Sequence, residues 1–97
     1  MDMLSRLNAW FDSQWEAEEH EDVMLKLESL DNPGWHLTVD VAWLKNMTLK
    51  DKIFEELSIS RAEGDWIVAR KDGTLLEIFG GIHNLDEMLL IFLDWAE

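Results

Sequence analysis

A strand–turn–strand pattern over residues 23–43 is the feature that most constrains the fold of this chain. Apolar and polar residues alternate on both sides of Asp31-Asn32-Pro33-Gly34, which contains the only proline of the sequence. Alternation with a period of two is typical of a strand that buries one face, and a proline followed by a glycine is typical of a tight turn. We therefore predict an antiparallel hairpin with strands at about residues 23–30 and 35–43.

The residue numbers on the two strands also predict the shape of the turn. In an antiparallel pair the numbers of opposite residues have a constant sum, and this sum must be even to place Leu25 and Leu27 on the same face as Leu37. The turn must therefore contain an odd number of residues or a bulge. A rigid corner that holds the register explains the motif, with Trp35 anchored in the core, and a recognition loop at the hairpin tip is the alternative.

The remainder of the chain predicts two helices and three further strands. Residues 3–19 carry apolar side chains at helical spacing, with Asp2 as a candidate N-cap residue. A third strand is expected at about residues 53–61, and the sequences Glu63-Gly64 and Asp72-Gly73 are typical turns of two further hairpins. Asn84 and Glu87 have the spacing of a capping box at the start of a C-terminal helix.

These elements predict a single α+β domain over residues 1–97. We expect a five-stranded antiparallel meander sheet with the N- and C-terminal helices packed on one face. The expected turns pair Ile59 with Val68 and Ile67 with Ile78. We expect the face with Trp66 and Phe79 to be the core face. The opposite face, with Ile67, Leu76 and Ile78, is then also apolar, and it is either covered by a connector or a helix or contacts a partner.

The charge of the chain restricts its partners. The sequence has 21 acidic and 8 basic residues, which gives a formal net charge of −13. Direct binding of nucleic acid or of an anionic membrane depends on basic side chains, so this composition argues against both. A basic protein surface is the complementary partner, and plain solubility is the simpler explanation of the charge.

Several kinds of chemistry lack the residues that they need. The chain has no cysteine, which excludes disulfides, thiol catalysis and cysteine-ligated zinc. It has no apolar run of about 20 residues, and its first residues do not show the basic region and apolar stretch of a secretory signal. We therefore expect a cytoplasmic protein without a membrane span. His36 and His83 lack ligand-like spacing to His20, and no phosphate-binding loop or nucleophile elbow is present. We therefore predict no enzymatic activity, no cofactor and no metal.

Three segments resemble the immunity protein 53 family of bacterial polymorphic toxin systems. They are Leu30-Asp31-Asn32-Pro33-Gly34-Trp35, Gly64-Asp65-Trp66-Ile67, and the C-terminal run from Asn84-Leu85-Asp86-Glu87 to Phe92-Leu93-Asp94-Trp95-Ala96-Glu97. Leu7, Trp10, Trp15 and Glu16 are similar to the opening helix of that family, so the resemblance covers nearly the whole chain. It implies a protein without catalytic residues that binds and neutralises a toxin. Immunity proteins often occlude the toxin's active site, and many toxins are nucleases with basic surfaces.

The expected binding surface combines an acidic stretch with the polar face of the sheet. Its predicted residues are Trp15, Glu16, Glu18, Glu19, Glu21, Asp22, Glu28, His36, Asp40 and Glu56. Trp15 or Trp35 would be the aromatic anchor, since aromatic residues often dominate interface energies. The predicted partner is a basic cognate toxin bound by a monomer or a weak homodimer. The alternatives are a small-molecule-binding domain and a homo-oligomeric structural domain without a toxin partner.

Overall fold

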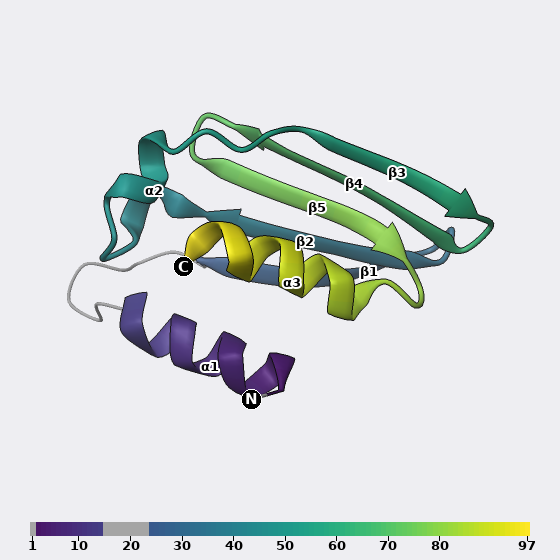
Figure 1. The fold of residues 1–97 in the computed structure, drawn as a ribbon, viewed down its shortest axis with the longest axis horizontal. Helices are drawn as coiled ribbons and strands as arrows, with labels where there is room; N and C mark the ends of the chain where they lie inside the picture. Colours follow the sequence, from purple (N-terminus) through teal and green to yellow (C-terminus); the bar gives the residue numbers. More distant parts are fainter. Residues whose placement is uncertain (1, 15–23) are drawn as a thin grey trace.

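The computed structural model describes residues 2–14 and 24–97. Within them, two long helices pack on an antiparallel sheet (Figure 1). The elements in chain order are α1 (Met3–Gln14), β1 (Leu25–Leu30), β2 (Gly34–Asp40), the 3-10 helix η1 (Val41–Trp43), α2 (Thr48–Asp51), β3 (Leu57–Ala62), β4 (Asp65–Asp72), β5 (Leu75–Gly81) and α3 (Leu85–Ala96). The Asp2 carboxylate accepts a hydrogen bond from the backbone N–H of Ser5 at 2.8 Å, which confirms Asp2 as the cap of α1.

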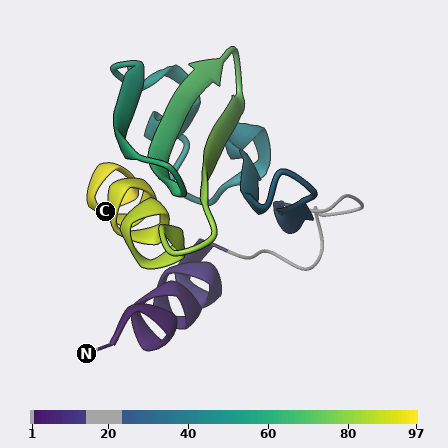
Figure 2. The same cartoon turned by 90° about the vertical axis from the view of Figure 1, so that its right-hand side faces the viewer.

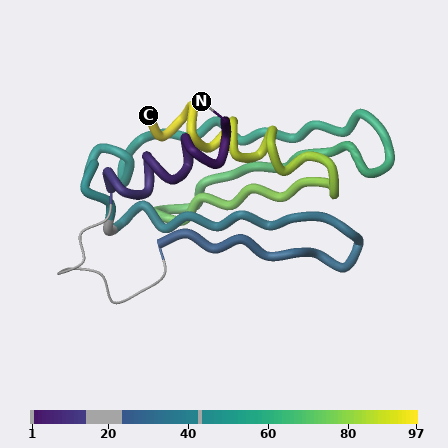
Figure 3. The backbone as a smooth tube through the Cα atoms, turned by 90° about the horizontal axis from the view of Figure 1, so that it is seen from below, coloured from purple at the N-terminus to yellow at the C-terminus, as the bar shows by residue number. Residues whose placement is uncertain are grey.

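The fold class is confirmed, but the order of the strands is not that of a meander. The described strands form a five-stranded antiparallel sheet in the order β1-β2-β5-β4-β3, and α1 and α3 lie on one face of it (Figure 2). The connector 41–56 carries the chain from β2 to β3 at the opposite edge, so that β5 pairs with β2 (Figure 3). The apolar strands thereby take the centre of the sheet, while the more polar β1 and β3 form its edges.

The predicted hairpin and its odd-length turn are confirmed. Leu27 lies opposite Leu37, and Leu30 lies opposite Gly34, so residues 31–33 form the turn. The Asn32–Pro33 peptide bond is cis. Trp35 packs against the core, and its indole Nε1 donates a hydrogen bond to the carbonyl of Ile82 at 3.1 Å. These contacts favour the rigid corner over the recognition loop.

The prediction that the Trp66 and Phe79 face forms the core is wrong. A bulge between Ser60 and Ala62 shifts the register of β3, so that Ile59 lies opposite Ile67 instead of Val68. In β5, Ile78 lies beside Leu37 of β2 and Ala69 of β4, whereas Ile67 lies opposite Gly80. The apolar face of β2 therefore continues through Ile78, and the helices cover this face. The side chains of Ile67, Leu76 and Ile78 are fully buried, so this face is covered within the molecule and is not available to a partner.

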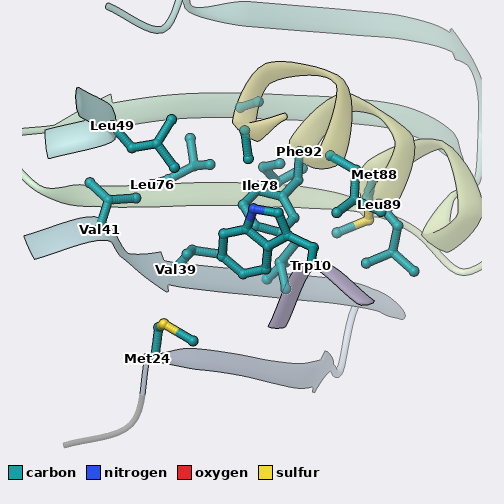
Figure 4. Packing of buried hydrophobic residues seen from close by; sticks show 14 of the residues in the cluster. Trp10, Met24, Val39, Val41, Leu49, Leu76, Ile78, Met88, Leu89 and Phe92 are labelled. Atoms are coloured by element: carbon teal, nitrogen blue, oxygen red, sulfur yellow. The ribbon is translucent and has the colours of Figure 1, made fainter. Parts of the chain in front are cut away.

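The core lies between this covered face and the two helices (Figure 4). Phe92 of α3 is fully buried, and the Trp10 indole of α1 meets its ring edge-on with 4.8 Å between centroids. Val41 and Leu49 from the connector are also buried and extend the core at the end of the sheet where β2 stops. The predicted burial of the C-terminal helix is confirmed.

A polar cluster fastens the β3–β4 turn to the start of α3. Asn84 opens α3 as predicted, but its side chain does not cap the helix. Its Oδ1 accepts from the backbone N–H of Trp66 at 3.3 Å, and its Nδ2 donates to Oδ1 of Asp65 at 2.9 Å. Arg61 donates to Asp65 and Glu87, so the cluster spans β3, β4 and α3. The predicted capping box is thus replaced by a link between the helix and a neighbouring turn.

This cluster should make stability depend on pH. Hydrogen bonds from Arg61 lower the pKa of Glu87 from its ordinary 4.5, and hydrogen bonds from Asn84 and then Arg61 lower the pKa of Asp65. Because both folded pKa values are depressed, the stabilisation is present above the unfolded values and is lost as the pH falls through the folded ones. Arg61→Gln should therefore flatten the fall in stability between about pH 5 and about pH 3, as measured by urea unfolding. Lys45→Gln, which removes a cation elsewhere, is the control, and equal pH profiles for both variants would contradict this role.

Candidate interaction surface

The face of the sheet opposite the helices carries the candidate site. We call it the open face; its side chains are those of Lys26, Glu28, Leu30, His36, Thr38, Asp40, Ser58, Ser60, Trp66, Val68, Arg70, Asp72, Leu75, Glu77 and Phe79. His36, Phe79 and Val68 lie side by side across the middle of the sheet. The rings of His36 and Phe79 stack at 4.1 Å between centroids with 11° between their planes. The centre of the open face is therefore a partly exposed aromatic and aliphatic surface.

The central charges of the open face are balanced within it. A hydrogen bond of 3.1 Å joins Nε2 of His36 to Oε2 of Glu77, and the guanidinium of Arg70 lies 3.6 Å from Oε1 of Glu77. The same guanidinium lies 5.5 Å from the centroid of the Phe79 ring. His36, Arg70 and Glu77 thus hold one another and the Phe79 ring in place. At the β1 edge, Glu28 forms an ion pair with Lys26, with 3.4 Å between Oε1 and Nζ.

The predicted site residues fall into three groups. Glu28 and His36 lie directly opposite each other on the open face, as expected. Asp40 lies at the end of β2, where its carboxylate accepts the N–H of Ala42 at 3.0 Å and caps η1. Glu56 precedes β3 at the far edge and borders a shallow hollow with Arg70 and Glu77. The stretch from Trp15 to Asp22 lies outside the described residues.

Sequence reasoning assigned Trp66 and Phe79 to the core and therefore missed their place on the open face. A signal for the correct face was present in the alternation of the strands. Arg70 shares a face with Trp66, and Glu77 shares a face with Phe79, whereas Ile67, Leu76 and Ile78 alternate with them. A charged residue in the middle of each strand marks the face that water or a partner reaches.

Positive side chains of the described residues are largely engaged within the molecule. Arg6 donates to Asp94 and Glu97, which joins α1 to α3, and Arg61 and Arg70 also pair with carboxylates. The Lys52 and Lys71 ammonium groups donate to backbone carbonyls. Exposed acids are spread over the same part of the chain: Asp12, Asp31, Asp51, Glu55, Glu56, Glu63, Asp72 and Asp86. The surface offered to a partner is therefore acidic.

The described residues contain neither a cluster of metal ligands nor a membrane-spanning helix. Within residues 2–14 and 24–97, no three histidine or acidic side chains converge to hold a metal ion. None of the helices in these residues combines the length and the apolar character that crossing a bilayer requires.

The described residues thus form a small α+β domain with helices on one face of its sheet, an open face with a partly exposed aromatic centre, and an acidic surface around it. The family model of immunity protein 53 matches residues 4–97, and the chain belongs to this family. Comparison with curated proteins and with solved structures found no match. Family membership implies a protein that protects against a toxin, and immunity proteins generally act without catalysis.

Proposed function

We propose that this immunity protein neutralises a basic toxin domain, such as a nuclease, by forming a stoichiometric complex that covers the toxin's active surface. The net charge of −13, with Arg6, Arg61 and Arg70 held in internal ion pairs, is the observation that carries the proposal. An acidic inhibitor attracts a basic enzyme over long range and competes with its anionic substrate for the same surface.

The proposed contact surface is the open face together with the acidic residues around it. Five strands and about six residues along each correspond to roughly 20 Å by 20 Å. That area is smaller than the roughly 800 Å² that each partner contributes to a standard interface. The rest of the contact must come from outside the open face, and we propose the acidic stretch 16–22 and Glu56 as contributors. Phe79 and Trp66 supply the aromatic surface that interfaces favour at their centre.

Co-expression tests the function directly. We expect the cognate toxin to be encoded next to this gene; expressed alone, that toxin should arrest growth of a host, and co-expression of this chain should restore growth. The purified pair should have the mass of a complex with equal numbers of both chains. Growth arrest that persists despite soluble expression of this chain would contradict the proposal.

Charge reversal tests the acidic stretch as a contact. Glu18→Lys with Glu19→Lys should slow association with the toxin about tenfold at low salt and reduce the salt dependence of the rate. The matched control is Glu63→Lys with Asp86→Lys, which changes the net charge equally at exposed positions near the β3–β4 turn and the start of α3. Association rates at several ionic strengths check this, and equal slowing by both pairs would show that only the total charge matters.

A further inference from the structure

The most exposed large hydrophobic side chain of the described residues belongs to Ile53, between α2 and β3. It is 84% exposed to solvent. Sequence periodicity predicts that β3 includes this residue, but the strand begins only at Leu57. Single exposed apolar residues are common and need no explanation by themselves. The backbone at Ile53, however, is fixed by a side chain of α3 that is distant in sequence.

Trp95 near the end of α3 contacts the backbone of Ile53 and the side chains of both its neighbours, Lys52 and Phe54. Its indole Nε1 donates to the carbonyl of Ile53 at 3.0 Å, and the Phe54 ring meets the indole edge-on at 5.8 Å between centroids. The Lys52 ammonium donates to the carbonyl of Trp95 at 2.5 Å and lies 5.3 Å from the centroid of its ring. Ile53 is thus displayed on a backbone that a partner would not have to order, which lowers the entropic cost of binding.

The surroundings of Ile53 combine an apolar base with an acidic rim. Ile91 and Trp95 of α3 border the hollow beside Ile53. Asp51, Glu55 and Glu56 are exposed around it. Phe54 and Glu56 also border the second hollow, which Arg70 and Glu77 of the open face complete. Residues 51–56 therefore lie at the edge of the sheet and are continuous with the open face.

We propose that residues 51–56, here called the anchor segment, insert Ile53 into an apolar depression on the toxin while Asp51, Glu55 and Glu56 meet basic side chains around it. This inference rests on the proposed function; Glu56 was predicted as a contact from the sequence, whereas Ile53, Asp51 and Glu55 were not. The acidic rim indicates which partner the anchor segment binds. Nucleic acid, an anionic membrane or a second copy of this chain would each bring a negatively charged surface against it. A basic protein surface matches both the rim and the apolar centre, and the segment adds contact area that the open face lacks.

Replacement of Ile53 tests the anchor segment, with the cognate toxin domain identified by growth rescue as the probe. Ile53→Ala should raise the Kd at least about tenfold, mainly through faster dissociation, because a buried aliphatic anchor is lost. Ile82→Ala is the matched control, since Ile82 is 48% exposed and lies beyond the opposite end of β5. We expect the control to change the Kd less than about twofold. Thermal unfolding midpoints should match that of the wild type, because neither side chain belongs to the buried core.

The outcomes separate this inference from the proposed function. Wild-type protein that binds the toxin, with Ile53→Ala binding equally tightly, would overturn the anchor segment and leave the proposed function standing. Wild-type protein that does not bind the toxin would overturn both. A change in the sedimentation mass of the free protein on Ile53→Ala, with unchanged toxin affinity, would assign the segment to self-association and also overturn the inference.

Discussion

Phe92→Ala should lower the free energy of unfolding by about 3–5 kcal/mol, a large share of the roughly 5–15 kcal/mol that stabilises a typical domain. The Phe92 side chain is fully buried, and its ring contacts the Trp10 indole with 4.8 Å between centroids. The ring is therefore part of the contact between α1, α3 and the sheet. Its removal leaves a cavity that the surrounding strands and helices can fill only by moving inward from their present packing. Urea unfolding followed by tryptophan fluorescence measures the loss.

Leu90→Ala provides the matched control for this prediction. Leu90 lies in the same helix but is 40% exposed, so truncation there should cost less than about 1 kcal/mol. Similar losses for both variants would contradict the central role of Phe92. A chain that ends before Leu85 should also lose cooperative unfolding, because the covered face of the sheet would be left open to water.

Gly81→Ala should destabilise the fold by about 2–3 kcal/mol. A Cβ atom at Gly81 would overlap the carbonyl oxygen of Gly64 and lie 2.8 Å from Oδ1 of Asn84. Gly34 meets the same restriction against the carbonyl oxygen of Gly80. Backbone therefore packs directly on backbone where the ends of β2 and β5 approach the β3–β4 turn. An added methyl group must separate these segments, since no flexible side chain is available to move aside at Gly64.

Gly73→Ala is the matched substitution for Gly81→Ala. Gly73 has φ of +60°, and an added Cβ would meet no atom within 4 Å. Only the strain of the left-handed conformation remains, which costs about 1 kcal/mol. Urea unfolding of both variants compares close packing with backbone strain. A smaller loss for Gly81→Ala than for Gly73→Ala would show that the two segments can separate at little cost.

Local patterns predicted the parts of the fold that depend on nearby residues. The alternation around Asp31-Asn32-Pro33-Gly34 predicted the hairpin and its odd-length turn, because a strand pair joined by a short turn has few possible registers. Helical spacing predicted α1 and α3 for the same reason. The meander was wrong because the pairing of β2 with β5 joins strands that are distant in sequence. No short-range pattern carries that information.

The candidate site depended more strongly on these distant contacts. Glu28 and His36 were placed together correctly, since one hairpin contains both. Phe79 was assigned to the wrong face because the bulge at Ser60–Ala62 and the pairing of Leu37 with Ile78 were not visible in local alternation. Ile53 was assigned to a strand because local alternation includes it. The contact that holds its carbonyl outside the sheet comes from Trp95, which is distant in sequence.

The acidic balance, the hairpin and the family of this chain all follow from its residues, because composition, short-range alternation and motif spacing need no knowledge of distant contacts. The tertiary structure decided which sheet face is buried and which is open. Both faces of β4 and β5 carry apolar residues, and the cost of burying Arg70 and Glu77, the pairing with β2 and the packing of α1 and α3 together select the buried face. That choice places His36, Phe79 and Glu77 on one open surface and leaves Ile53 exposed beside it.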